Sequence, residues 1–179
     1  KKKFAGVEVR GKTLGVVGGP VNKQLFDALD REYDLTRSKV HFKDLMPAEI
    51  PAAIGSKQVQ ALMIVAPISE RYLAQIRTLF PRDAKQKPTL LAVESAGAIA
   101  AVNKAYESYD LPKGTIRGSP AIPDDDLATL RVPLYLVAKS TVSNDLITDL
   151  TKAIMEGRAS MIAEYPLVAQ IAAPSTEKD

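Results

Sequence analysis

Three short segments of the sequence combine small residues with side chains that can donate or accept hydrogen bonds. They are Gly18-Gly19-Pro20-Val21-Asn22, Ala66-Pro67-Ile68-Ser69 and Glu94-Ser95-Ala96-Gly97. Small residues let a ligand approach the backbone closely, and the N–H groups at the start of a helix attract a carboxylate or another anion. Asn22, Ser69 and Ser95 can add side-chain hydrogen bonds. These residues therefore predict binding of a small anion without a catalytic group.

Each segment also has an ordinary structural interpretation. Serine is among the residues preferred at the N-cap of a helix, so Ser69 and Ser95 can serve as caps only. Glu94 either faces a ligand or interacts favourably with the dipole of the following helix. The ligand-binding prediction therefore depends on the three segments meeting at one edge of a sheet. It assigns to the site Gly18, Gly19, Pro20, Asn22, Pro67, Ser69, Glu94 and Ser95.

Other kinds of site find less support in the sequence. The glycines near residue 18 form neither a dinucleotide-binding pattern nor a phosphate loop. The single histidine, His41, has no serine or carboxylate at a spacing typical of catalysis, so a structural or surface role is favoured. The consecutive aspartates 124–126 lack the alternating spacing of a calcium loop. We predict no enzyme activity, no metal and no cofactor, with an enzyme using Glu94 as an alternative.

The composition is that of an ordinary globular chain. The 179 residues are 46% hydrophobic, carry a net charge of +3 and include no cysteine, which excludes disulfides and thiolate metal sites. No apolar run approaches the length of a membrane helix, so the chain is expected to be soluble. The charges do not gather into one large basic run, which disfavours nucleic acid as a partner. Because the first residue is Lys1, we expect a processed or truncated product.

Four strands alternate with helices in the first part of the chain. The predicted strands are residues 13–18, 39–42, 61–66 and 89–93. Each precedes a segment whose apolar residues recur at helical spacing, and 61–66 is continuously apolar, as in a central strand. Parallel neighbours need long connections, and helices must then cover the sheet. We predict an α/β fold with a mostly parallel, doubly wound sheet and helices on both faces.

The pattern changes after the fourth helix. Residues 107–127 are rich in Pro, Gly and Asp, which predicts a long irregular excursion at a lobe junction. A last strand is predicted at 129–139, where Pro133 favours an edge position. Ser143 is the expected N-cap of a helix that ends near Gly157, and a further helix follows at 159–165. We predict a ligand-binding α/β lobe at 1–127, followed at 128–179 by a return strand and C-terminal helices that complete or dock on it.

Several stretches resemble one family, the TAXI-type solute receptors of tripartite ATP-independent periplasmic (TRAP) transporters. One is Tyr-Asp-Leu-Pro-Lys-Gly-Thr-Ile-Arg-Gly at 109–118, which resembles the family's leucine-proline-small-glycine-tyrosine stretch. The others are the apolar strand at 129–138, the helix at 143–154 and Gly11-Lys12 before the first strand. The sequence departs from the family at Pro20 and Val21, where serine-like residues are common, and at Gln60, where aspartate is usual.

The resemblance implies that the chain is the second lobe of a receptor with a periplasmic-binding-protein-like fold, plus the segment that returns to a first lobe missing here. Such a receptor closes by hinge motion on a small organic acid or amino acid. It then delivers the ligand to a membrane permease. The implied location is periplasmic or extracytoplasmic, with a membrane anchor in some longer relatives. The alternatives are an effector-sensing module of a regulator and an interaction module of a fused transporter.

Overall fold

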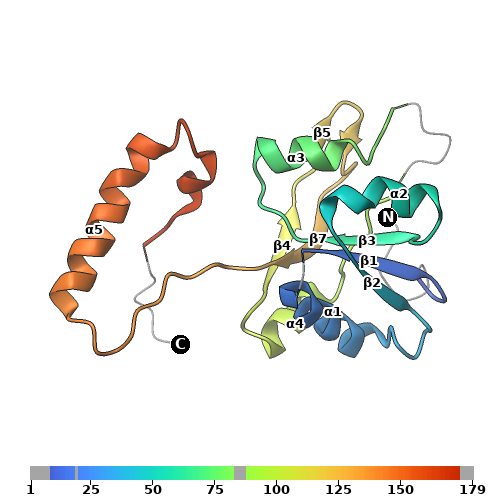
Figure 1. The fold of residues 1–179 in the computed structure, drawn as a ribbon, viewed down its shortest axis with the longest axis horizontal. Helices are drawn as coiled ribbons and strands as arrows, with labels where there is room; N and C mark the ends of the chain where they lie inside the picture. The colour runs from blue at the N-terminus through green and yellow to red at the C-terminus, as the bar shows by residue number, and fades with distance from the viewer. Residues whose placement is uncertain (1–8, 19, 83–87, 174–179) are drawn as a thin grey trace. The chain divides into compact units, whose positions relative to one another are not determined.

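The computed structural model describes residues 9–18, 20–82 and 88–173 (Figure 1). The chain divides into two compact units. The first unit consists of Lys1–Ala66 with Ala74–Pro133, and the second of Pro67–Leu73 with Leu134–Asp179. All the strands belong to the first unit, whereas the second is built around one long helix.

A parallel sheet forms the centre of the first unit. Its strands are β1 (Thr13–Val17), β2 (His41–Leu45) and β3 (Ala61–Ile64), in the order β2-β1-β3. Gly15 of β1 lies opposite Lys43 on one side and Leu62 on the other. This confirms a parallel α/β fold for three of the predicted strands. The strand at 61–66 was predicted to be central, but β3 lies at an edge of the described sheet and β1 is central.

Helices cover both faces of this sheet. Successive residues of β1 point to opposite faces, and each face packs against a different helix. Leu14 and Val16 join a hydrophobic cluster with Leu25 and Leu29 of α1 (Pro20–Tyr33). Val17 joins a second cluster that contains Ile50 and Ala53 of α2 (Ile50–Gly55), a helix preceded by the 3₁₀ turn η1 (Pro47–Glu49). In Figure 1, α1 and α2 accordingly lie on opposite sides of the sheet.

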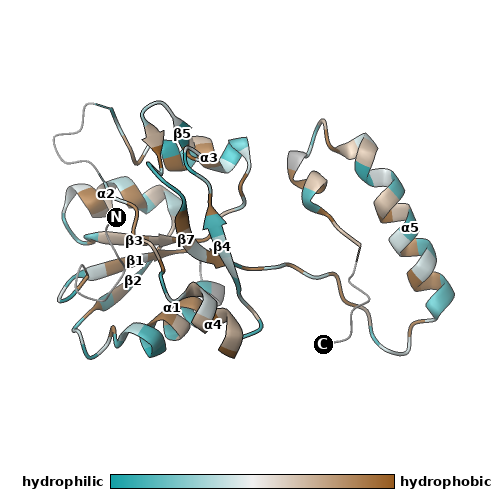
Figure 2. Cartoon of the chain, turned by 180° about the vertical axis from the view of Figure 1, so that it is seen from behind, coloured by the Kyte–Doolittle hydropathy of each residue, from teal (hydrophilic) through white to brown (hydrophobic). Residues whose placement is uncertain are grey.

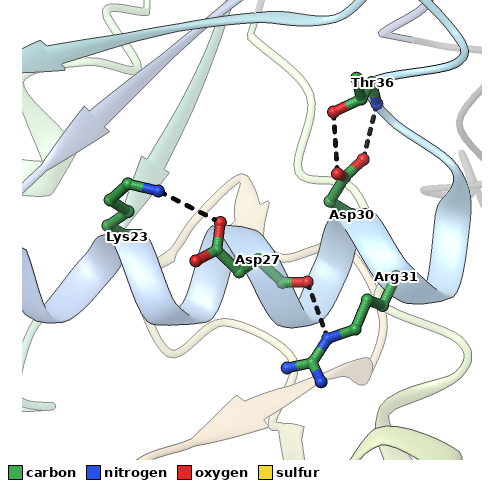
Figure 3. Close-up of polar contacts among 5 residues, drawn as sticks. All are labelled: Lys23, Asp27, Asp30, Arg31 and Thr36. Atoms are coloured by element: carbon green, nitrogen blue, oxygen red, sulfur yellow. Dashed lines mark hydrogen bonds and ion pairs between the residues drawn. The ribbon is translucent and has the colours of Figure 1, made fainter.

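Polar contacts stabilise α1 and fix its C-terminal end (Figure 3). Lys23 and Asp27 form an i,i+4 ion pair with 3.5 Å between Nζ and Oδ1. Beyond the helix, Thr36 donates its N–H to Oδ1 of Asp30 at 2.6 Å and its hydroxyl to Oδ2 at 2.8 Å. The Asp30 carboxylate therefore holds the turn that carries the chain from α1 toward β2.

The fourth predicted strand, at 89–93, is wrong. Only Ala92 forms a bridge, and the N–H of Val93 donates to the carbonyl of Ala128 at 2.8 Å. Leu91 and Val93 instead pack as half-buried side chains against the hydrophobic cluster between β1 and α1. These apolar residues are therefore partly buried by side-chain packing, although they form no strand of the parallel sheet.

The excursion predicted at 107–127 is also wrong, because it contains strands. They are β4 (Glu107–Leu111), β5 (Arg117–Gly118), β6 (Ala121–Ile122) and the start of β7 (Leu127–Arg131). β4 pairs antiparallel with β7, and β5 with β6. Exposed and half-buried residues alternate along β4, which is the period of a strand with one solvated face. The strand predicted at 129–139 ends at Arg131, because Pro133 has no N–H to continue the ladder.

Two short helices complete the first part of the chain. They are α3 (Glu70–Arg77), whose residues are divided between the two units, and α4 (Ala96–Val102). Ile99 of α4 is buried in the cluster that α1 covers. This places α4 on the same face of the sheet as α1.

The second unit contains α5 (Asn144–Met161) and the 3₁₀ turn η2 (Pro166–Gln170). The hydroxyl of Ser143 accepts a 3.3 Å hydrogen bond from the Leu146 N–H, which confirms the predicted N-cap. α5 runs four residues past Gly157 and absorbs the start of the helix predicted at 159–165. Apolar and polar stretches alternate along it (Figure 2), yet none of its residues is buried.

The segment before α5 is extended and apolar. Leu134, Tyr135, Leu136 and Val137 are between 74% and 95% exposed and belong to no strand. In the described part of the chain, no helix has both the length and the apolar character needed to cross a membrane.

Candidate functional site

The carboxyl ends of β1 and β3 mark a preferred place for a ligand. The chain passes from β1 to β2 on one side and then crosses to β3 on the other, so the strand order reverses at β1. In open α/β sheets, ligands bind outside the carboxyl ends of the strands where this reversal occurs. Val17 and Ile64 are the paired residues at these ends, and Gly18 follows Val17 directly.

Asn22 fixes the turn that follows β1. Its side chain is only 5% exposed and is the one buried polar side chain among the described residues. Nδ2 donates to the carbonyl of Val17, which spans the turn from the end of the strand into the first turn of α1. Gly18 has a φ of 118°, and a Cβ there would collide with Nδ2 of Asn22. The conformation of the turn therefore requires both residues.

The first turn of α1 offers backbone N–H donors and contains no acidic side chain. Pro20 is the first helical residue and has no N–H, whereas the N–H groups of Val21 and Asn22 fall in the first turn, where intrahelical acceptors are missing. The first turn contains no acidic residue that would repel an anion. Gly19, also assigned to the site from the sequence, lies outside the described residues.

The turn at Glu94 and Ser95 does not lie with Gly18. The N–H of Ser95 donates to the hydroxyl of Tyr33 at 3.0 Å, and Tyr33 is the last residue of α1. Asn22 and Tyr33 are eleven residues apart, which corresponds to roughly 16 Å along a helix. Ser95 is the N-cap of α4 by position, but its side chain makes no capping hydrogen bond. The structure therefore places this turn toward the other end of α1.

Pro67 and Ser69 belong to the second unit. The carbonyl of Ser69 accepts from the N–H groups of Tyr72 at 3.0 Å and Leu73 at 2.8 Å, so Ser69 begins the first turn of α3. In the same unit, Nε2 of Gln170 donates to the carbonyl of Ile68 at 3.2 Å. Of the eight predicted site residues, Gly18, Pro20 and Asn22 therefore form one local group.

Two cavities of the first unit have linings that include none of the described residues predicted for the site. One, of about 650 Å³, is lined by Phe80, Arg117 and the aspartates 124–126. The other, of about 430 Å³, lies between β2 and α2 beside Lys43 and Ala52. The sequence interpretation missed the larger cavity because residues 107–127 were read as an irregular junction. In the sequence, this cavity is indicated by Arg117 together with the aspartates 124–126 in a proline-rich stretch.

The histidine and the acidic residues are the other candidates for a metal site in the sequence. His41 is the first residue of β2 and is exposed, in keeping with the surface role favoured from the sequence. Within the described ranges, no three His, Asp or Glu side chains are grouped as metal ligands.

No model of a known protein family matches the sequence, and the searches of curated proteins and of solved structures gave no match. The structure shows an α/β fold with a three-strand parallel sheet. The geometry of the turn after β1 and the sequence resemblance therefore remain as indications of function.

Proposed function

We propose that this chain is a ligand-binding lobe of an extracytoplasmic solute receptor of the TAXI type, which binds a small organic acid or amino acid for a membrane permease. The observation that carries the proposal is the turn after β1. Gly18 and the buried Asn22 hold this turn at the carboxyl end of the central strand, where the strand order reverses. A preorganised backbone at such a point suits recognition of a carboxylate.

In this proposal, a ligand carboxylate accepts hydrogen bonds from the N–H groups of Val21 and Asn22. The positive end of the α1 dipole favours the negative charge. Asn22 acts as a positioning residue, because its side chain is engaged with Val17 rather than turned to solvent. Binding by one lobe is expected to be weak, since a second lobe must close over the ligand and exclude water.

The doubly wound, periplasmic-binding-protein-like architecture is part of the same proposal. The two helices on opposite faces of the sheet support it. The resemblance further implies that the segment at 129–139, which contains the exposed run Leu134–Val137, returns to a first lobe. An extended apolar run with more than 70% of each side chain exposed suits such a strand, because its backbone and side chains still need partners.

That same run favours a second candidate, an interaction module that has no ligand of its own. An effector-sensing module of a regulator shares the two-lobe architecture, so fold alone does not separate it from a receptor. Saturable binding of a small solute distinguishes the receptor and the effector module from the interaction module.

Calorimetric titration of the receptor that contains this lobe tests the proposal. The probes are acetate, succinate and L-glutamate. We expect saturable binding of at least one probe and a loss of affinity of about tenfold or more in Asn22→Leu, because the turn is no longer tied to Val17. Gly97→Ala, at a position with open space, is the control and should bind normally. Absence of saturable binding for all three probes would count against a carboxylate receptor.

A further inference from the structure

A cavity of about 650 Å³ lies within the first unit, away from the turn after β1. Its described lining comes from residues 80–82 and 88–90, which follow α3, and from Arg117 and residues 120–127 around the β5–β6 hairpin. Small-molecule sites commonly have volumes of about 300 to 1,000 Å³ and combine apolar walls with a few polar groups. Phe80, Leu90 and Ile122 supply apolar wall here. The cavity thus has the size and the lining of a ligand site.

Two arginines are the positively charged residues of its described lining. Arg117 donates from Nη1 to the carbonyl of Phe80 at 2.9 Å and from Nε to the carbonyl of Pro120 at 3.3 Å. Arg82 donates from Nη2 to the carbonyl of Ser119 at 3.3 Å. A guanidinium has five N–H donors, so these bonds orient each head group and leave further donors available. Held in this way, the two arginines can receive a carboxylate with little loss of conformational entropy.

Three carboxylates provide the negative charge. Oδ1 of Asp126 accepts from the N–H of Lys113 at 2.8 Å, and Oδ1 of Asp125 accepts from the N–H of Asp126 at 2.9 Å. These bonds order the acidic turn. Asp124 is exposed and has no hydrogen-bond partner among the described residues. Its carboxylate is therefore available to a cationic group.

We infer that this cavity binds a free amino acid with an apolar side chain, or another small zwitterion of that form. Its carboxylate meets Arg117 and Arg82, its ammonium meets Asp124 and Asp126, and its side chain lies against Leu90 and Ile122. A lone anion would face three carboxylates, and a lone cation would face two guanidinium groups. A ligand with both charges offers a partner to the two arginines and also to Asp124 and Asp126. This site is separate from the one in the proposed receptor function and does not depend on it.

Amide chemical-shift titration of the ¹⁵N-labelled chain tests this inference. L-Leucine is the probe, while acetate and isopentylamine each carry only one of its charges. We expect L-leucine to shift the amides of residues 117–127 in a saturable way. The single-charge probes should bind at least about tenfold more weakly, since each lacks a charge-assisted contact.

Asp124→Asn should weaken binding of L-leucine about tenfold without affecting folding, because this carboxylate is exposed. Asp44→Asn on β2, another exposed aspartate, is the matched control and should leave binding unchanged. Equal binding of acetate or isopentylamine would overturn the inference. So would the absence of shifts at 117–127, or an Asp124→Asn chain that binds normally. Shifts confined to residues 21–23 would support the receptor proposal and still overturn this one.

Discussion

At the level of single residues, Gly18 and Asn22 depend on each other. The φ of 118° at Gly18 brings the Val17 carbonyl within reach of the Asn22 amide, and the Asn22 side chain in turn occupies the space that a Cβ would need. The sequence placed both residues in a binding turn. The sequence predicts a side-chain hydrogen bond from Asn22 to a ligand, whereas in the structure Nδ2 of Asn22 donates to the carbonyl of Val17. That difference follows from a backbone angle, which residue types alone do not specify.

Gly18→Ala should lower the free energy of unfolding by about 1 to 3 kcal/mol, because alanine is strained at this φ and its Cβ collides with Asn22. Urea denaturation followed by circular dichroism measures the effect. The matched control is Gly97→Ala in α4, where nothing lies within 4 Å of the new Cβ. Helix propensity predicts that this control is neutral or stabilising by up to about 1 kcal/mol. Equal losses in the two variants would contradict the special role of Gly18.

Tyr106 gives stability a dependence on alkaline pH. The side chain is 6% exposed, and burial raises the pKa of its hydroxyl above the ordinary value, with a smaller opposing effect from the positive charge of Arg31. The folded state therefore holds this proton more tightly than the unfolded state. The resulting stability is present below about pH 10 and is lost as the pH rises through the folded pKa.

Urea denaturation between about pH 9 and 11.5 checks this sign. The wild-type chain should lose more stability over this interval than Tyr106→Phe, which has no hydroxyl to ionise. Other tyrosines and the lysines also titrate here, so the quantity to read is the difference between the two chains. An identical pH dependence would show that Tyr106 ionises as easily in the folded state as in the unfolded state.

At the level of elements, β1 was predictable and β4 was not. Residues 13–17 form a nearly continuous apolar run, which is typical of a parallel strand buried on both faces. The apolar residues that follow recur at helical spacing and predict α1 equally clearly. In β4, exposed and half-buried residues alternate, but its Glu, Ser and Asp resemble the composition of a loop. The run at 89–93 has the composition of a strand but forms no strand in the structure, where the N–H of Val93 bonds to the carbonyl of Ala128 in β7. Strand pairing is non-local, and local composition does not contain it.

Gly15 tests the packing of the β1 face toward α2. A Cβ at this position would lie 2.7 Å from Cδ1 of Leu45 and 2.9 Å from Cδ2 of Leu62. Since Leu45 is buried, Gly15→Ala should cost about 1 to 3 kcal/mol through overpacking, measured by urea denaturation. Gly55→Ala at the end of α2, with open space around it, should cost clearly less. A neutral Gly15→Ala would indicate a cluster that is loosely packed at this point.

At the level of the whole molecule, burial differs between the two units. The buried residues that form the hydrophobic clusters all belong to the first unit, whereas the described residues from 134 onward include none. A unit without a buried core gains little stability from the hydrophobic effect and generally needs a partner. The sequence predicted a junction near residue 127. The change in burial comes at 133, because β7 is held by β4 up to Arg131.

Limited proteolysis with chymotrypsin measures this difference. We expect the first cleavage after Tyr135 or Leu136, because both side chains are more than 70% exposed and belong to no strand or helix. Tyr106, which is buried, should be cut much later. Mass spectrometry of the early fragments identifies the sites. Early cleavage at Tyr106 with residues 134–137 intact would contradict the assignment of the core to the first unit.

Amide chemical-shift titration of the ¹⁵N-labelled chain with L-glutamate and succinate tests whether the turn after β1 faces a ligand. We predict saturable shifts at Val21, Asn22 and Lys23, with a dissociation constant on the order of 1 mM for a lobe acting alone. These shifts should disappear in Asn22→Leu and persist in Gly97→Ala. If neither ligand moves these amides at concentrations far above that value, the turn is an ordinary connection and the receptor proposal loses its main support.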